Sequence, residues 1–283
     1  MPTGGGKSLT FQLPASFETG VSIIVMPLLS LIYDQVSYLS SINIPSISFS
    51  QSDYHTIIKE IDKVINQTND SVKVIFLTPE KISKSAFVFD ILKKLYLKDL
   101  IRRFVIDEAH CVSMWGHDFR SDYLVLKNIR NIFSDIPILA LTATATESVR
   151  IDIINQLGMN KKTLYFQSSF NRPNIIYHVI QKTWSMDLIP NILKILNSKN
   201  CKNKIGIIYC VTIKECEYIS QTLKSKFIKC ESYHSKLDPQ LRNSIQNKWM
   251  VEEINIIVAT IAFGMGINKP NVEFIIHSSF SKS

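Results

Sequence analysis

The chain has 283 residues, 46% of them hydrophobic and 20% charged, which allows packed cores and excludes intrinsic disorder. No apolar run reaches the ~18 residues that a membrane span needs, and no signal peptide is evident, so we expect an intracellular protein without membrane association. The net charge of +8 favours an acidic partner, nucleic acid first, although a modest basic excess can also serve solubility alone.

A glycine-rich loop opens the chain, with the sequence Pro2-Thr3-Gly4-Gly5-Gly6-Lys7-Ser8. Its glycines allow a tight turn whose backbone amides can point toward phosphate oxygens. Lys7 would reach the β- and γ-phosphates of a nucleotide, and the Ser8 hydroxyl would bind Mg²⁺. Residues 9–13 contain no helix breaker, so we expect a helix whose N-terminus faces the phosphates. A flexible glycine linker is the alternative, but it would not require Lys and Ser at this spacing.

Short apolar, β-branched runs then alternate with longer helix-like stretches. The runs lack the alternation of a half-exposed strand, as expected for parallel strands that are covered on both faces. This βαβ series predicts a doubly wound parallel α/β sheet. The expected strands are 21–26, 72–77, 103–106 and 137–141, and the expected helices are 28–40, 54–66, 87–97 and 147–157.

A polar, Pro-containing segment around residues 158–173 interrupts the series, and the pattern then restarts. We therefore predict two domains, residues 1–167 and 168–283, the second without a phosphate loop of its own. The expected strands of the second domain are 204–209, 228–233, 254–260 and 272–277, and its expected helices are 214–227 and 239–250.

Two adjacent carboxylates, in the run Asp107-Glu108-Ala109-His110, follow the third predicted strand. In open α/β sheets, ligands bind at the carboxyl ends of the strands. Asp107 is placed to hold Mg²⁺, and Glu108 to orient and activate an attacking water. A solvated acidic turn is the alternative, and it fits poorly with a phosphate loop upstream and with Thr142-Ala143-Thr144 one strand further on.

These segments resemble motifs I, II and III of the superfamily-two helicases. The run from Asp107 to Tyr123, DEAHCVSMWGHDFRSDY, is similar to the RecQ family in particular. Further similarity to that family lies in residues 26–31, 34–35 and 259–267, and residues 104–106 and 169–172 look closest to its Bloom-type eukaryotic members.

The resemblance implies two tandem RecA-like domains with the P-loop NTPase fold, in which Thr3 to Ser8 bind ATP and His110 joins Lys7, Asp107 and Glu108 in the catalytic set. It implies an ATP- and Mg²⁺-dependent 3′–5′ DNA helicase that acts on single-stranded, forked or branched DNA in repair and recombination. The expected location is the nucleus if the protein is of the Bloom type, and otherwise the cytoplasm or nucleoid. An RNA helicase and a catalytically inactive nucleic-acid-binding relative are the alternatives.

An aromatic-rich loop follows the acidic pair and contains Trp115, His117, Phe119 and Arg120. Aromatic rings beside a cation can stack on bases and neutralise a phosphate. In the RecQ family this loop couples DNA contact to ATP hydrolysis, and Met114 stands where the family usually has Gln. The family motifs also place four threonines at DNA-contacting or coupling positions, where hydroxyls suit phosphates, although a threonine can equally satisfy its own turn. They are Thr142, Thr144, Thr212 and Thr260.

The resemblance places one strand before Met1 and motif VI, with its arginine finger, after Ser283. We therefore expect both termini to be truncated and the strand that carries Asp107 to lack a neighbour. Because an arginine finger accelerates NTP hydrolysis by a factor of ~10³–10⁵, we expect this polypeptide alone to hydrolyse ATP poorly or not at all.

Overall fold

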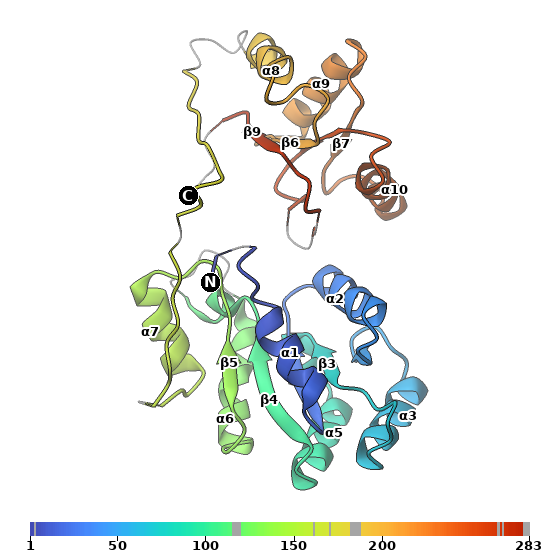
Figure 1. The fold of residues 1–283 in the computed structure, drawn as a ribbon, viewed down its shortest axis with the longest axis vertical. Coiled ribbons are helices and arrows are strands. Elements are labelled where there is room, and N and C mark those ends of the chain that lie inside the picture. The colour runs from blue at the N-terminus through green and yellow to red at the C-terminus, as the bar shows by residue number, and fades with distance from the viewer. Residues whose placement is uncertain are drawn as a thin grey trace. The chain divides into compact units, whose positions relative to one another are not determined.

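The computed structural model describes residues 1–2, 4–114, 120–160, 162–169, 171–181, 188–264, 267 and 269–279. The chain divides into two compact units, Met1–Ile175 (unit 1) and Ile176–Ser283 (unit 2), and each contains its own parallel sheet (Figure 1). The domain boundary expected from the sequence, after residue 167, lies a few residues earlier and stays a prediction.

Unit 1 is built on a five-stranded sheet in the order β2-β3-β1-β4-β5, with all pairs parallel. The four strands expected from apolar runs are confirmed, while β2 contains only Ser46-Ile47-Ser48 and gives no apolar signal. Strands β1 and β3 are buried along their whole length because helices cover both faces of the sheet. The strands are β1 (Val21–Val25), β2 (Ser46–Ser48), β3 (Val74–Leu77), β4 (Ile101–Ile106) and β5 (Ile138–Ala140).

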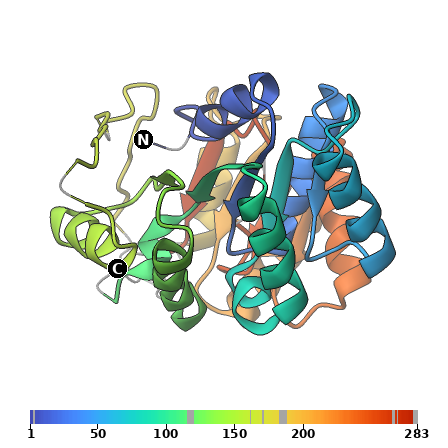
Figure 2. The same ribbon diagram turned by 90° about the horizontal axis from the view of Figure 1, so that it is seen from below.

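Helices pack on both faces of this sheet. One face carries α1 (Leu9–Phe17) and α2 (Leu29–Ser41), around a core that includes Phe11 and Ile32. Figure 2 shows α1, in dark blue, on the opposite side of the sheet from α5 and α6, in green. The second face and the connections carry α3 (Tyr54–Ile65), α4 (Pro79–Lys84), α5 (Ala86–Leu97), η1 (Ala109–Val112), η2 (Ser121–Leu126), α6 (Lys127–Ile132) and α7 (Glu147–Gln156).

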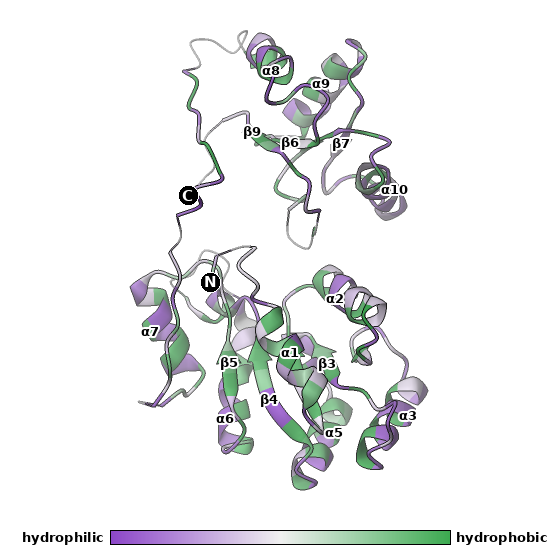
Figure 3. Ribbon diagram, viewed as in Figure 1, coloured by the Kyte–Doolittle hydropathy of each residue, from purple (hydrophilic) through white to green (hydrophobic). Residues whose placement is uncertain are grey.

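The strand that leads to the acidic pair lies inside the sheet. Strand β4 pairs with β1, where Ile106 is opposite Val25, and with β5, where Ile106 is opposite Ala140. The expectation that this strand lacks a neighbour is therefore wrong, because the edges of the sheet are β2 and β5. In Figure 3 the strands are mostly green, with one hydrophilic stretch on β4, where Arg102 and Arg103 interrupt the apolar run.

Unit 2 has a four-stranded parallel sheet in the order β7-β8-β6-β9. Helices α8 and α9 pack on one face with Ile192 and Ile219, and α10 packs on the other through Trp249, which is fully buried against Phe263. All strands and helices expected here are confirmed, and α8 is additional. The elements are α8 (Leu188–Leu196), β6 (Gly206–Tyr209), α9 (Ile213–Lys224), β7 (Cys230–Tyr233), α10 (Pro239–Met250), β8 (Ile256–Ala259) and β9 (Phe274–His277).

Across the described ranges, we find no helix that combines the length and the apolar character needed to cross a membrane.

Candidate nucleotide-binding site

The glycine-rich loop forms a tight turn that ends in helix α1. Gly4 and Gly6 have φ angles of +78° and +83°, which favour glycine. The Gly5 amide donates to the Pro2 carbonyl at 3.0 Å, and a Cβ atom on Gly5 would lie 2.9 Å from that carbonyl oxygen. The turn therefore requires glycines for its shape. Thr3, which the sequence also assigns to this loop, lies outside the described residues.

Lys7 and Ser8 lie directly before the N-terminus of α1. Ser8 has helical backbone angles, and its carbonyl accepts the Gln12 amide at 3.0 Å. The Ser8 hydroxyl makes no capping hydrogen bond to α1, and the amides of Leu9, Thr10 and Phe11 donate to loop carbonyls. The amides of Gly6, Lys7 and Ser8 donate to no described residue, which leaves them for a ligand. A helix N-terminus with this loop before it is suited to an anion, as the sequence predicts.

The acidic pair lies at the carboxyl end of β4. The Asp107 amide donates to the Val25 carbonyl of β1 at 2.9 Å, and the Ala109 amide donates to the Leu141 carbonyl beyond β5 at 2.9 Å. Between them Glu108 adopts a left-handed backbone with φ of +47°, which is unfavourable for a residue with a Cβ atom. Strained backbone of this kind clusters at functional sites, because the strain fixes the direction of a side chain.

A chain of polar contacts links three of the predicted motifs. Lys7 Nζ lies 3.3 Å from Glu108 Oε1, and His110 Nδ1 lies 3.2 Å from Glu108 Oε2. His110 Nδ1 also lies 3.0 Å from Thr142 Oγ1 and 3.5 Å from Thr144 Oγ1. Residues separated by more than 100 positions along the sequence therefore meet at one edge of the sheet.

The two carboxyl groups have different electrostatic environments. Burial, followed by the charge of Glu108, raises the pKa of Asp107 to about 6. Burial also acts to raise the pKa of Glu108, but hydrogen bonding to His110 and the charge of Lys7 outweigh it, so that this pKa is lowered. Glu108 is consequently ionised at neutral pH, while Asp107 is a carboxylate that a nearby cation would stabilise.

The donor set fits Mg²⁺ better than a transition metal. Asp107 is 9% exposed and offers carboxylate oxygens, and Ser8 offers a hydroxyl, which are the hard ligands that Mg²⁺ prefers. In the parts of the chain that the structure describes, no group of three or more His, Cys, Asp or Glu side chains could hold a metal by itself. Mg²⁺ commonly takes one or two protein oxygens and completes its shell with phosphate and water.

Arg120 links the end of the predicted coupling loop to the segment that follows β1. Its guanidinium Nη1 donates to the Pro27 carbonyl at 2.9 Å, and its amide donates to the Cys111 carbonyl at 3.0 Å. Tyr123 is fully buried behind it and donates its hydroxyl to the Asp107 carbonyl at 3.1 Å. The other loop residues predicted to contact DNA, Trp115, His117 and Phe119, lie outside the described residues.

The two threonines of unit 2 that were predicted to contact DNA lie at the carboxyl ends of neighbouring strands. Thr212 follows β6 and caps α9, because its Oγ1 accepts the Glu215 amide at 3.1 Å. Thr260 follows β8 and is 8% exposed, and its amide donates to the Tyr233 carbonyl at 3.2 Å. Both threonines therefore have structural roles, and their predicted contact with a nucleic acid stays a prediction.

A groove that sequence reasoning missed opens at the carboxyl ends of β1 and β3. It has a volume of about 700 Å³, and its lining includes Ser30, Ser50 and Thr78 beside Glu80, Lys81 and Lys84. Its residues come from three separate stretches of sequence, none of which forms a recognisable phosphate motif. Only the order of the strands brings them together.

Comparison with protein families agrees with this architecture. Residues 1–151 match the DEAD/DEAH box helicase model, and residues 185–283 match the helicase conserved C-terminal domain. The chain belongs to the DEAD/DEAH box helicase family.

Individual relatives confirm the resemblance to RecQ-type helicases over the whole chain. The ATP-dependent DNA helicase Q-like 4B of Arabidopsis thaliana is 45% identical over 283 residues, which cover 100% of this chain and 24% of that protein. The RecQ-like DNA helicase BLM of Xenopus laevis is 42% identical over 287 residues, which cover 100% of this chain and 21% of that protein. The chain thus spans about a quarter or less of the length of these relatives.

A solved structure supports the RecA-like fold. Dbp5 of S. cerevisiae bound to RNA and ADP BeF3 superposes with a TM-score of 0.66 at 18% identity, covering 98% of this chain and 68% of that one. At this identity the likeness shows the fold alone.

Proposed function

We propose that the chain is the motor core of an ATP-dependent 3′–5′ DNA helicase of the RecQ type, acting on single-stranded, forked or branched DNA in the nucleus. The observation that carries the proposal is the contact chain from Lys7 through Glu108 to His110 and Thr142. It joins a phosphate loop, an acidic pair and a threonine motif. A motor that couples ATP hydrolysis to movement on DNA requires such a connection between its nucleotide site and other motifs.

The residues of unit 1 have distinct roles in this proposal. Gly4 to Gly6 and the N-terminus of α1 bind the phosphates of ATP, and Lys7 neutralises their charge. Asp107 and Ser8 hold Mg²⁺, which supplies charge neutralisation at the phosphates when bound. Glu108 orients the attacking water, since its carboxylate is ionised and fixed between two hydrogen-bonding groups.

His110 and Thr142 connect this site to the surface that binds DNA. In the proposal, the groove beside Pro27 and Thr78 holds the phosphate backbone, with its hydroxyl groups and with Lys81 as a point charge. Arg120 donates a hydrogen bond to the carbonyl of Pro27, which lines the groove, so the coupling loop is attached directly to the groove.

Strand displacement tests the proposal directly. The chain, expressed with its complete reading frame, is mixed with ATP, Mg²⁺ and duplexes that carry a 3′ or a 5′ single-stranded tail, made of DNA or RNA. We expect displacement of DNA duplexes with a 3′ tail. Preference for an RNA tail would favour an RNA helicase, and binding without displacement in any substrate would favour an inactive relative.

A further inference from the structure

The positive charge of the chain is concentrated in unit 2. From residue 176 onward there are 14 Lys and Arg residues against eight Asp and Glu residues, so that most of the net charge of +8 belongs to this unit. None of the residues assigned above to the nucleotide site explains this excess. Within unit 2, residues 194–229 contain eight lysines and two glutamates.

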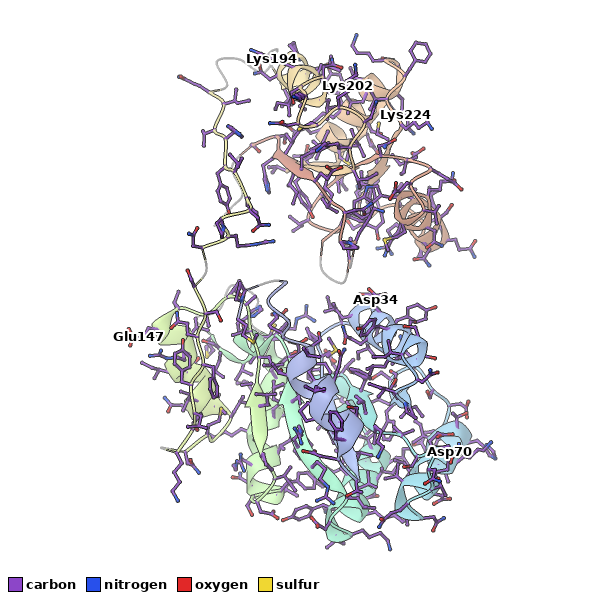
Figure 4. All side chains as sticks on the ribbon, in the orientation of Figure 1. Asp34, Asp70, Glu147, Lys194, Lys202 and Lys224 are labelled. Atoms are coloured by element: carbon purple, nitrogen blue, oxygen red, sulfur yellow. The ribbon has the colours of Figure 1, made fainter. Side chains whose placement is uncertain are left out.

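Six exposed lysines lie at the same edge of unit 2, which we call the lysine edge. They occupy the C-terminal turns of α8 and α9 and the connections from these helices to β6 and β7. Helices run opposite to the strands in a parallel α/β unit, so these helix ends meet the amino ends of the strands. Figure 4 shows three of them, Lys194, Lys202 and Lys224, at one end of the unit. The six are Lys194, Lys199, Lys202, Lys224, Lys226 and Lys229.

Backbone hydrogen bonds hold the lysine edge together. The Asn255 amide donates to the Lys229 carbonyl, and the Gly206 amide donates to the Asn255 carbonyl, both at 3.0 Å. The edge lies opposite the one formed by Thr212 and Thr260, at the other end of strands that are roughly 13 Å long. Lys224 forms an ion pair with Glu231 at 2.6 Å, whereas the other five have no ion pair with any described residue.

Phe227 stands among these lysines with its ring in solvent. The residue is 97% exposed and has φ of +60°. Its amide donates to the Lys224 carbonyl at 2.9 Å, and the next amide, of Ile228, donates to the Leu223 carbonyl at 3.1 Å. This is the turn that ends α9, where glycine is favoured because it adopts the left-handed backbone without strain.

An aromatic side chain is unusual at this position. The other described non-glycine residues with positive φ are Asn, Gln, Asp or Glu. A phenylalanine here incurs backbone strain and buries almost none of its ring, so it contributes nothing to the core. Strain that packing does not require points to a function of the side chain.

We propose that the lysine edge is a second binding surface for single-stranded nucleic acid, separate from the site proposed above. The ammonium groups of Lys199, Lys202 and Lys226 neutralise phosphates without reading sequence, and a base stacks on the ring of Phe227. Both faces of an almost fully exposed ring are accessible, which suits stacking. An acidic protein would not need this ring, and one aromatic side chain is a weak anchor for a membrane.

Charge reversal with a matched control tests the lysines. The variant Lys199→Glu/Lys202→Glu/Lys226→Glu is compared with Lys59→Glu/Lys98→Glu/Lys127→Glu. The control changes three exposed lysines of unit 1 by the same charge, and none of the three has an ion pair with a described residue. Binding of a fluorescent single strand of about 40 nucleotides is measured without ATP over a range of salt concentrations. The slope of log K against log salt should decrease in magnitude by about 2 in the first variant, because each lost phosphate contact contributes ~0.7. The control should retain the slope of the unaltered chain.

Substitutions of Phe227 provide a second test, which can be interpreted even if the triple lysine variant folds poorly. Phe227→Trp should bind as well as the unaltered chain, while Phe227→Leu and Phe227→Ala should both weaken binding about 5-fold or more, since leucine keeps bulk but has no ring to stack. Equal slopes in the two lysine variants, or equal affinity in all three Phe227 variants, would overturn the proposal. Because no ATP is present, this result is independent of whether the chain hydrolyses ATP.

Discussion

The ammonium of Lys7 lies 3.3 Å from Oε1 of Glu108, although 101 positions separate the two residues in the sequence. The contact joins the phosphate loop to the end of β4, and the left-handed backbone at Glu108 directs its side chain. Oε2 of the same carboxylate lies 3.2 Å from His110 Nδ1. With its pKa lowered, Glu108 is suited to hold and orient a water rather than to accept a proton at neutral pH.

Removing the Lys7 ammonium should abolish hydrolysis. We expect Lys7→Ala to reduce DNA-stimulated ATP hydrolysis by roughly 10²-fold or more, because a preorganised charge at the phosphates is lost. Lys7→Arg should not restore the rate, since a planar guanidinium does not replace a point charge in this turn. The control is Lys59→Ala, which changes an exposed lysine, and circular dichroism checks the fold. Normal turnover by Lys7→Ala would show that the glycine loop does not bind the phosphates.

Asp107 should make the ligand-free chain less stable as pH rises. Its pKa is raised to about 6, so the native state keeps the proton while the unfolded chain releases it near pH 3.8. The free energy of unfolding should therefore fall as pH increases from about 4 to about 6, by on the order of 3 kcal/mol. Asp107→Asn should remove this dependence and stabilise the chain at pH 7.5.

Urea unfolding at pH 4.5 and pH 7.5, with and without Mg²⁺, measures the effect. Asp107→Asn should also lose the stabilisation that Mg²⁺ gives to the unaltered chain and lose ATP hydrolysis. Asp90→Asn, at an exposed position of α5, is the matched control and should behave as the unaltered chain. A destabilised Asp107→Asn variant at pH 7.5 would contradict the conclusion that burial raises the pKa of Asp107.

Much of the fold could be predicted from the sequence, because buried parallel strands are continuous apolar runs. The runs at Val21–Val25 and Ile256–Ala259 begin and end within two residues of their expected bounds. Strand Ser46–Ser48 could not be predicted, since its pairing with β3 rather than its own composition makes it a strand. Local motifs were also sufficient to place Lys7, Asp107, Glu108, His110 and Thr142 at one site.

The electrostatics of the site could not be predicted in the same way. The raised pKa of Asp107 depends on burial, and burial depends on the helices and on Tyr123 packing behind the strand end. The left-handed backbone of Glu108 has no signal in the sequence, because glutamate rarely adopts it. The groove beside Pro27 likewise depends on the order of strands in the sheet.

The hydroxyl of Thr142 should matter for coupling. It accepts the Thr144 amide at 3.1 Å and lies 3.0 Å from His110 Nδ1. We expect Thr142→Val, which keeps the shape, to lower DNA-stimulated ATP hydrolysis about tenfold. It should cost only about 0.5–1 kcal/mol of stability, since water can replace the acceptor of the exposed Thr144 amide. Thr142→Ser keeps the hydroxyl and should retain most of both. Equal rates in the valine and serine variants would exclude a role for this hydrogen bond.

Thr212 offers a way to separate a helix cap from a phosphate contact. Asp and Asn both replace Thr as N-caps with little loss, so Thr212→Asp and Thr212→Asn should unfold at similar urea concentrations. If Thr212 faces a phosphate, Thr212→Asp should bind single-stranded DNA roughly tenfold more weakly than Thr212→Asn, because only the aspartate adds a negative charge. Equal affinities would leave Thr212 as the cap of α9 and nothing more.

The stimulation of ATP hydrolysis by nucleic acid distinguishes a DNA-driven motor from an RNA helicase and from an inactive relative. The chain, expressed with its complete reading frame, is assayed with Mg²⁺ and ATP alone, with single-stranded DNA and with single-stranded RNA of the same sequence, beside Lys7→Ala. We expect a rate that rises at least tenfold with DNA, rises much less with RNA, and is lost in Lys7→Ala. A rate that DNA does not change, or one that persists in Lys7→Ala, would contradict the assignment of a DNA-driven ATPase to this chain.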